Sequence, residues 1–424
     1  MAQDRQAARQ AAIAGSVGNF IEWYDFAAYA YLAVVLGKVF FPAADSFAAF
    51  LAAFSVYASS YVVRPVGAAV LGRLGDRWGR KPTLLVTLVG MCVATALIGV
   101  LPSYAAAGVL APVLLVLLRI VQGLSAGGEF GGAVSLMAEF APPGRRGLFG
   151  SWQSFTVGLG LLAGSGFATL LTSVLSAAAL ASWGWRLPFI EAVVFGLVAV
   201  YLRSKVDETP VFLRLREQPP LPRTAGPLRF PAPTWVLVFF VIGALLAWTT
   251  AGNVFLVVLP SYAAATLHLA AGLAQWLSFT ANAVFTATIP LFGLLSDRLG
   301  RRAVMLTGAA LILVLSYPLF LAIDSGSTDL MFGCAAIAGA AVAMLAGPGP
   351  AMLAELFPAR IRVTGLGLGY ALSAAAFGGT AALIVGGLKV LTGDPLAAAY
   401  YPMIGGVVSL ICLAMLRRHT DLES

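Results

Sequence analysis

The chain is a succession of long apolar segments, and this pattern limits its fold more than any other feature. A helix that crosses a bilayer needs about 20 apolar residues, and lipid leaves helices or closed barrels as the only spanning structures. Hydrophobic residues make up 60% of the 424 residues and charged residues 10%, whereas a soluble domain carries about 25% charged residues. The sequence therefore predicts an all-α membrane protein with twelve transmembrane helices, at 13–38, 47–72, 82–102, 109–139, 148–175, 184–203, 234–265, 272–296, 303–323, 330–357, 363–391 and 397–416.

The basic residues give the orientation of these helices. Twenty-one of the 26 Lys and Arg residues fall in segments on the side of residue 1. The other five, Lys38, Arg64, Arg119, Arg186 and Lys389, do not lie squarely in a loop on the opposite side. Because cytoplasmic loops are enriched in Lys and Arg, we expect both termini in the cytoplasm. The net charge of +8 then reflects topology and contact with lipids, and no nucleic-acid partner is expected.

Two short loops repeat along the chain. Residues 72–81 read GRLGDRWGRK, and residues 293–302 read GLLSDRLGRR. The segments Ala138-Glu139-Phe140 and Ala354-Glu355-Leu356 form a second repeat at a similar offset. Such repeats are typical of membrane carriers built by internal duplication. We therefore expect two six-helix lobes, with the first lobe at 1–203, a Pro-, Arg- and Glu-rich cytoplasmic linker at 204–233, and the second lobe with a short tail at 234–424.

The repeated loops have the composition of a cytoplasmic gate. We expect Asp76 to accept hydrogen bonds from a helix N-terminus or from neighbouring arginines, and Gly79 to permit a tight turn. A basic loop would also serve as a simple topology anchor, but an anchor requires no repeated aspartate. The expected gate residues are Gly72, Asp76, Arg77, Gly79, Arg80, Glu139, Arg145, Asp297, Arg298, Arg301 and Glu355.

The first apolar segment carries two carboxylates, Glu22 and Asp25, three residues apart on one helix face, with Tyr29 one turn further on. A charge at the bilayer centre costs roughly 2.5–3.5 kcal/mol, so such residues are candidates for function. Either carboxylate would serve as the carrier of a coupled proton. The alternative is that both pair permanently with Arg64 and Arg119 and only hold helices together.

Arg64 and Arg119 are the two arginines deepest in the expected helices. Their guanidinium groups suit a carboxylate ligand, so they are candidates for binding an anionic solute, or else for internal ion pairs. Gln122 follows Arg119 by one turn, and Glu129 is a further candidate for the proton. Arg186, near the outer mouth of the sixth span, either contacts the solute or extends to lipid headgroups.

The second lobe has no charged residue in the middle of a span. Its polar candidates, Asn253 and Tyr370 among them, are more often packing residues than ligands in membrane helices. The two histidines, His268 and His419, fall outside the expected spans, so a coupled proton would have to reside on a carboxylate. The three cysteines lie in apolar segments, and neither a disulfide framework nor a metal site is expected. No cofactor is expected beyond the proton as coupling ion.

The repeated loops resemble those of the major facilitator superfamily. More specifically, GNFIEWYDF, YVVRPVGAAVLG, RIVQGLSAGGEFGG, WGWRLPF and DETP resemble stretches of the metabolite:proton symporter family. This resemblance implies a carrier in a bacterial inner membrane that imports a small organic solute with protons. Twelve spans in two lobes require no partner subunit, so we expect a monomer. Carriers of this type handle citrate and tricarballylate, α-ketoglutarate, shikimate, or proline and betaine.

The resemblance also favours a substrate. The stretch GLFGSWQS, with Gln153, and the end of the chain resemble the citrate and tricarballylate branch, and the likeness to the α-ketoglutarate carrier implies Arg64 and Arg186 as a carboxylate-binding pair. We therefore expect an organic carboxylate, with proline or betaine as the alternative. A drug antiporter or a membrane sensor is less favoured, and no enzyme motif occurs. The expected solute contacts are Arg64, Arg119, Arg186, Gln122, Tyr29, Gln153, Asn253 and Tyr370.

Overall fold

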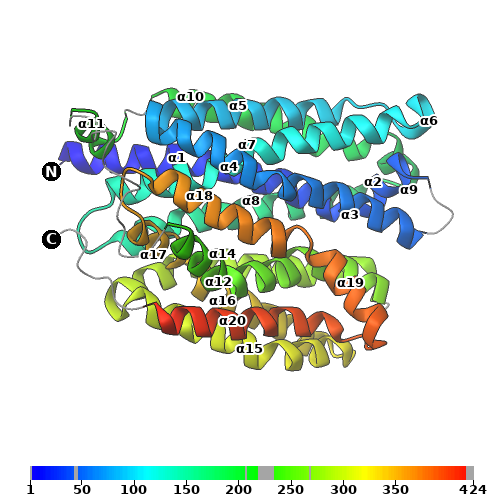
Figure 1. The fold of residues 1–424 in the computed structure, drawn as a ribbon. Coiled ribbons are helices and arrows are strands. Elements are labelled where there is room, and N and C mark those ends of the chain that lie inside the picture. Colours follow the sequence, from blue (N-terminus) through cyan, green and yellow to red (C-terminus); the bar gives the residue numbers. More distant parts are fainter. Residues whose placement is uncertain (1, 43–45, 206–207, 218–233, 267–268, 417–424) are drawn as a thin grey trace.

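The computed structural model describes residues 2–42, 46–205, 208–217, 234–266 and 269–416. Within these ranges every regular element is a helix. The helices run roughly parallel to one long direction of the molecule, and the start of α1 and the end of α20 lie at the same end (Figure 1). Helices of the first half form one layer and helices of the second half form the other (Figure 1). The lobe and linker boundaries given above remain a proposal.

The first half contains twelve helical elements among the described residues. They are α1 (Ala2–Tyr31), α2 (Ala33–Phe40), α3 (Ser46–Val62), α4 (Arg64–Trp78), α5 (Arg80–Gly99), α6 (Tyr104–Ala107), α7 (Leu110–Phe140), α8 (Arg146–Val174), α9 (Ala177–Ser182), η1 (Gly184–Arg186), α10 (Leu187–Ser204) and α11 (Pro210–Glu217). The second half contains α12 (Thr234–Gly252), η2 (Asn253–Val258), α13 (Leu259–Thr266), α14 (Ala271–Leu299), α15 (Arg301–Asp324), α16 (Thr328–Ala346), α17 (Gly349–Leu356), α18 (Arg362–Ser373), η3 (Ala374–Gly378), α19 (Ala381–Thr392), η4 (Ala397–Ala399) and α20 (Tyr400–Met415).

Ten helices or helix runs in the described part of the chain are long and apolar enough to cross a membrane. The remaining two expected spans correspond to α1 and to the pair α3 and α4. Helix α1 carries Glu22 and Asp25, which lower its hydropathy, and α3 is only 17 residues long because the helix is interrupted at Val63. Counting these two, the prediction of a twelve-helix membrane protein is confirmed.

Two membrane helices of the second half contain a π-helical segment, at η2 and at η3. Such wider turns are rare and are frequent at functional sites. The two segments approach each other, because a side chain added at Gly378 would lie 3.1 Å from Nδ2 of Asn253. They therefore bring irregular backbone from two helices to one place in the middle of the molecule.

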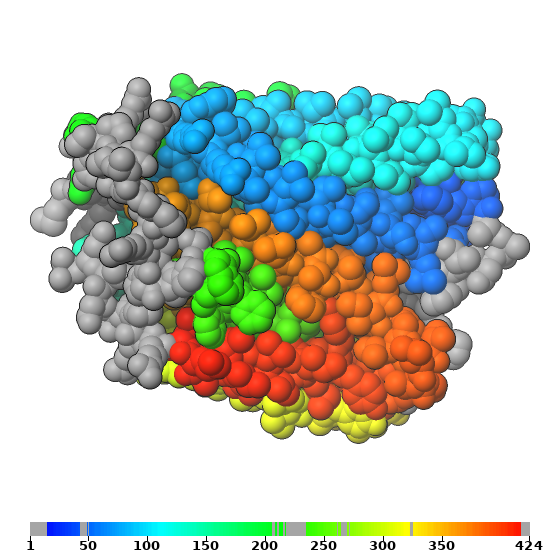
Figure 2. Space-filling view, in the orientation of Figure 1, coloured from blue at the N-terminus to red at the C-terminus, as the bar shows by residue number. Residues whose placement is uncertain are grey.

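The two halves meet along two long seams. Helix α8 packs against α14, and α18 packs against α4 and α7. The second contact is close, since a Cβ at Gly131 of α7 would overlap the carbonyl oxygen of Val363, and only glycine lets the backbones approach this far. Figure 2 shows α18 and α19 in orange between the blue helices of the first half and the red α20.

Candidate functional site

A cavity lies between the two halves. It is lined from the first half by Trp23, Tyr61, Val157 and Leu161, and from the second half by Trp248, Thr249, Gly252, Asn253, Leu256, Val257, Phe285, Tyr370 and Ala374. The space between protein atoms there, including the part that opens to solvent, is about 530 Å³. The wall consists of aromatic and aliphatic groups with a few amide and hydroxyl groups, and no lining residue carries a charge. Ligand sites in proteins commonly have this composition.

Two buried ion pairs lie beside this cavity in the first half. Arg64 contacts Glu22 with Nη2 and Oε1 2.8 Å apart, and Arg119 contacts Asp25 with Nη1 and Oδ2 2.6 Å apart. Spacing of three residues on α1 directs both carboxylates to one face, where α4 and α7 supply the arginines. Pairing of buried charges is required because an isolated charge is far more costly in such surroundings. The sequence did not decide whether these arginines form internal ion pairs or bind the solute, and the structure shows that both form ion pairs.

Aromatic rings cover both guanidinium groups. The Arg64 carbon Cζ lies 4.0 Å from the ring centre of Tyr61 and 4.6 Å from that of Phe26. Arg119 lies over Tyr29 at 3.9 Å. Among the described residues, Nε and Nη1 of Arg64 have no hydrogen-bond partner. Arg64 is therefore held by the Glu22 carboxylate, by rings and by the nearby hydroxyl of Tyr370, and its Nε and Nη1 can still donate to a further acceptor.

The other expected solute contacts of the first half are already engaged. Gln122 donates to Oγ1 of Thr95 at 2.6 Å, and Tyr29 donates to the carbonyl of Ala53 at 3.0 Å. Gln153 donates weakly to Asn19 at 3.4 Å. None of these three side chains lines the central cavity. Their role as solute contacts is therefore left as a prediction.

Asn253 and Tyr370 do line the cavity. Asn253 donates from Nδ2 to the carbonyl of Thr249 at 2.8 Å. The ring of Tyr370 stacks on Phe130 of the first half, with ring centres 3.8 Å apart. Tyr370 therefore contributes both to the cavity wall and to a contact between the two halves.

Arg186 lies elsewhere. Its Nη1 donates to the carbonyls of Gly99 and Leu101, at 3.0 and 2.6 Å. Gly99 is the last residue of α5 and Leu101 follows it, and a positive charge is favourable at such a helix end. The guanidinium also lies over the ring of Trp185 at 4.4 Å. Arg186 does not line the central cavity, and the carboxylate-binding pair with Arg64 that the resemblance implies stays a prediction.

Glu129 is paired as well, with a partner that sequence reasoning missed. Arg203 from the end of α10 contacts both oxygens of the Glu129 carboxylate, and Thr87 donates to Oε2 at 2.8 Å. Arg203 is the last residue of the sixth expected span, and from the sequence it was counted only among the basic residues on the cytoplasmic side. Its position at a span boundary is a signal that such a residue can turn inward.

The aspartates of the two repeated loops cap helices of the opposite half. Asp76 accepts hydrogen bonds from the backbone N–H and the hydroxyl of Thr364, at 3.1 and 2.6 Å, in the first turn of α18. Asp297 accepts from the backbone N–H groups of Gly147 and Leu148, at 2.7 and 2.9 Å, in the first turn of α8. The expected contact with a helix N-terminus is therefore present twice. Burial raises the pKa of Asp76, and the bonds from Thr364 oppose this rise.

Further charged contacts lie at the same end. Glu139 contacts Arg80 of its own half at 3.2 Å and Arg362 of the other half at 3.3 Å. Arg301 and Glu355, which are 3.0 Å apart, both belong to the second half. Gly72 and Gly79 are both buried at this end, against Thr364 and Glu208 respectively. The remaining three expected gate residues, Arg77, Arg145 and Arg298, are exposed.

Glu208 is a second residue that the sequence did not single out. Its carboxylate accepts hydrogen bonds from the backbone N–H groups of Arg80 and Lys81, at 3.1 and 3.2 Å, at the start of α5. The contacts of Glu208 show that this part of the expected linker binds to the first repeated loop.

The two halves also meet beside the cavity. The hydroxyl of Tyr31, from the last turn of α1, lies 3.4 Å from the carbonyl of Leu256 in η2, and Leu256 lines the cavity. Asn282 of α14 donates to the same carbonyl at 3.0 Å. The wall of the cavity therefore includes a polar contact between the two halves.

Family comparisons agree with this architecture. Residues 11–219 match the family model "Sugar (and other) transporter", and residues 241–423 match "Major Facilitator Superfamily". The solved structure of the proton:xylose symporter XylE superposes with a TM-score of 0.77 over 97% of this chain and 96% of that chain. At 19% identity this likeness shows the fold alone.

Three curated relatives cover most of the chain. The ectoine/proline transporter ProP of Corynebacterium glutamicum is 36% identical over 95% of this chain and 82% of its own length. The proline/betaine transporter of Escherichia coli is 34% identical, with the same coverage. The α-ketoglutarate permease of E. coli is 33% identical over 96% of this chain and 93% of its own length. The similarity to the metabolite:proton symporters stated above is confirmed, and the chain belongs to the major facilitator superfamily of membrane transporters and is not an enzyme.

Proposed function

We propose that this chain is a proton-coupled symporter that imports a small zwitterionic solute, such as proline or betaine, by alternating access. The observation that carries this proposal is the cavity wall, which is aromatic and bears no charge of its own. The rings of Trp23, Tyr61, Trp248 and Tyr370 face a space whose nearest guanidinium, Arg64, is neutralised by Glu22. A solute with no net charge suits such a site better than a polyanion does.

The two ends of a zwitterion would meet different groups. An ammonium or quaternary ammonium group is attracted to the faces of Trp and Tyr rings, with roughly 0.5–2 kcal/mol per contact. A carboxylate would accept hydrogen bonds from Nε and Nη1 of Arg64, which lack a partner among the described residues. The relatives named above for ectoine, proline and betaine add support from sequence.

An organic carboxylate was the first expectation from sequence, and it is retained as the second candidate. One observation favours it: Arg64 and Arg119 both approach the ring of Phe26, at 4.6 and 5.6 Å, so two guanidinium groups lie near each other. The α-ketoglutarate permease is a relative of similar identity. Against it, both arginines are already paired, and a dicarboxylate would have to displace Glu22 and Asp25 together.

The ion pairs offer a means of coupling. A solute carboxylate that binds Arg64 competes with Glu22 for the same cation. A proton on Glu22 removes that competition, because a neutral carboxyl no longer needs a cationic partner. Binding of the solute and of the proton would then favour each other. Asp25, held by Arg119, is the second candidate for this role.

The remaining features of the carrier are also proposals. The chain would act as a monomer in a bacterial inner membrane, surrounded by lipid, with both termini in the cytoplasm. The two lobes would rock about the central cavity, and the contacts of Asp76 and Asp297 would close the cytoplasmic end. Twelve helices in two halves provide all parts that such a cycle requires.

A binding panel tests the solute class. Purified protein would be heated with betaine, proline, ectoine, α-ketoglutarate or citrate, and a ligand at 100 times its Kd should add about 2.7 kcal/mol. We expect stabilisation by the zwitterions. Trp248→Leu should weaken betaine binding by up to roughly 30-fold if it removes one cation–π contact of about 2 kcal/mol. Trp183→Leu, at an exposed ring outside the cavity, is the matched control.

Uptake into proteoliposomes completes the test. Labelled betaine or proline should exchange across the membrane and should accumulate when the outside is acidic. Stabilisation and uptake with α-ketoglutarate or citrate, and with none of the zwitterions, would replace this proposal by the carboxylate one. Equal effects of Trp248→Leu and Trp183→Leu on betaine binding would exclude the aromatic wall as the site.

A further inference from the structure

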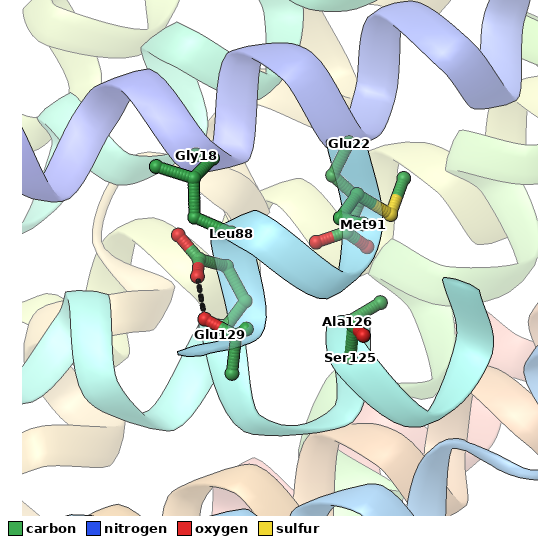
Figure 3. A pocket seen from close by; sticks show the side chains of 8 residues that line it. Gly18, Glu22, Leu88, Met91, Ser125, Ala126 and Glu129 are labelled. Atoms are coloured by element: carbon green, nitrogen blue, oxygen red, sulfur yellow. Dashed lines mark hydrogen bonds between the residues drawn. The ribbon is translucent and has the colours of Figure 1, made fainter. Parts of the chain in front are cut away.

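A second, smaller cavity lies inside the first half, away from the central one. It is lined by Gly18 and Glu22 of α1, by Thr87, Leu88 and Met91 of α5, and by Ser125, Ala126 and Glu129 of α7. In Figure 3 the carboxyl groups of Glu22 and Glu129 both point into the space between these helices. The central and the smaller cavity have no lining residue in common.

The two carboxylates face this cavity from different ion pairs. Glu22 contacts Arg64, which borders the central cavity through Tyr61. Glu129 contacts Arg203 and Thr87, closer to the end that carries the termini and the repeated loops. The cavity therefore connects a carboxylate beside the solute site with a carboxylate nearer to the expected cytoplasmic side.

The space between the carboxylates suits water. It has room for about one water molecule, and a buried water needs two to four polar partners. Glu22, Glu129 and the hydroxyl of Ser125 supply such partners on its walls. The Ser125 hydroxyl faces Gly90 of α5, and a Cβ at Gly90 would lie only 2.6 Å from this hydroxyl oxygen.

Gly18 keeps the inner end of the cavity open for Glu129. A Cβ at this position would overlap the Glu129 carboxylate and the Arg203 guanidinium, so glycine lets the ion pair reach the backbone of α1. The Glu129–Arg203 pair is therefore built against three helices, α1, α5 and α10, and is not a loose surface contact.

We propose that this cavity is a proton path, in which a water molecule beside Ser125 transfers the proton from Glu22 to Glu129, separately from the route of the solute. The proposal deepens the proposed function and rests on it for the source of the proton. It names Glu129 and Ser125 as relay residues for the ion, whereas Arg64 and the aromatic wall serve the solute.

The transfer conserves protons and charge at each step. Protonated Glu22 gives its proton to the water, and the water gives one of its own to an oxygen of Glu129. Glu22 becomes anionic again and recovers its pair with Arg64. Glu129 becomes neutral, and its bond to Arg203 changes from an ion pair to a hydrogen bond. Glu129 then releases the proton towards the end of the chain termini and pairs with Arg203 again.

Other charged and titratable groups surround this path. Among the described residues they come from each helix packed around the cavity: Asp25 on α1, Arg64 on α4, Cys92 on α5, Arg119 on α7 and Arg203 on α10. Asp25 and Arg119 neutralise each other. The thiol of Cys92 lies against Gly196 and does not line the cavity. Glu22 and Glu129 are therefore the two titratable groups on the cavity wall.

Ser125→Val tests the path without removing a charge. Valine fills the space between the carboxylates and removes the hydroxyl. Ser135→Val is the matched control, because Ser135 is also buried on α7 and lies outside the cavity. Two rates would be compared in proteoliposomes: solute counterflow at equal pH, which requires no net proton movement, and net uptake driven by an inward proton gradient.

We expect Ser125→Val and Glu129→Gln to lower net uptake, relative to counterflow, by about tenfold or more, because a positioned group that transfers a proton contributes roughly 10²–10⁴-fold. Ser135→Val should leave this ratio unchanged. A parallel loss of both rates in Ser125→Val would indicate a structural role and overturn the proposal. Unchanged net uptake in both Ser125→Val and Glu129→Gln would overturn it as well.

A measurement without solute separates the relay from the proposed function. Protein on a supported membrane would be exposed to a pH jump, and the charge movement of internal protonation would be recorded. A transient current in the unmodified chain that slows in Ser125→Val supports the path even if no zwitterion is transported. Absence of the current, or an identical current in Ser125→Val and the unmodified chain, contradicts it.

Discussion

Asp76 and Asp297 each bind the first turn of a helix in the opposite half, but Asp76 uses one carboxylate oxygen and Asp297 uses two. Replacement by asparagine should therefore have unequal effects at the two positions. Asp76 accepts both of its bonds from Thr364 through a single oxygen, Oδ2. Asp297 accepts from Gly147 through Oδ1 and from Leu148 through Oδ2. Replacing either aspartate by asparagine removes the charge and leaves one accepting oxygen.

The cost differs because of that oxygen count. In Asp76→Asn the amide oxygen can retain both bonds. The lost charge assistance, roughly 1 kcal/mol per bond, is offset because asparagine also removes the buried charge, whose desolvation outweighs these bonds and raises the pKa of Asp76. In Asp297→Asn the amide nitrogen must face one backbone N–H, which leaves that donor without an acceptor and costs about 1–3 kcal/mol. At 1.36 kcal/mol per factor of ten, the population open at this end should change little for Asp76→Asn and should rise roughly tenfold or more for Asp297→Asn.

Hydrogen exchange of the capped amides measures this opening. Peptides that contain the first turns of α8 and α18 report on Gly147 and Thr364 separately. Exchange at Gly147 in Asp297→Asn should accelerate more than exchange at Thr364 in Asp76→Asn. Thr364→Val keeps the buried charge of Asp76 and removes one of the bonds that stabilise it, so it should accelerate exchange of this turn more than Asp76→Asn does. Equal acceleration in the two asparagine variants, or a larger effect at Thr364, would refute the argument from oxygen geometry.

Three further predictions use other parts of the structure. Because burial raises the pKa of Asp76, closure should weaken as pH rises from the ordinary carboxyl value through the raised one; exchange of the first turn of α18, corrected for intrinsic rates, should show this dependence and Asp76→Asn should abolish it. Gly18→Ala should destabilise the protein by about 1–3 kcal/mol, because its methyl group collides with Glu129, whereas Gly272→Ala, in open space, should not lower the thermal midpoint. Arg186→Gln should reduce stability and leave solute affinity unchanged, because this guanidinium contacts the carbonyls of Gly99 and Leu101 and the ring of Trp185 and does not line the central cavity. A rise in the Kd of the solute would restore Arg186 to the binding site.

The membrane helices were predictable because each is determined by its own residues. An apolar segment of sufficient length is a spanning helix whatever its neighbours are. The gate aspartates were also predictable from local sequence, because Asp76 and Asp297 occupy the same position in two similar polar loops. Their contact with a helix N-terminus follows from a general preference of carboxylates for that position.

The pairing of the buried charges was less accessible. The sequence indicated which buried charged residues were candidates for ion pairs but not which ones pair. Arg119 and Asp25 are 94 positions apart, and only the packing of α1 against α7 brings them together. Arg203 was missed because a basic residue at a span boundary has the same pattern whether it faces water or turns inward. The π-helical turn at Asn253 was missed for a different reason, since no local motif distinguishes it from an ordinary apolar helix.

The pairing of charges leads to a final test of the solute class. The three buried carboxylates Glu22, Asp25 and Glu129 are each matched by one arginine, so this part of the first half carries no net charge. Addition of one proton and one zwitterion leaves the loaded carrier with a charge of +1, whereas one proton and one monocarboxylate leave it neutral. A membrane potential contributes about 2.3 kcal/mol per charge per 100 mV. If one proton accompanies each solute, betaine or proline should therefore accumulate in response to an inside-negative potential at equal pH. Uptake that responds to the proton gradient and ignores the potential would instead indicate a monocarboxylate as the solute.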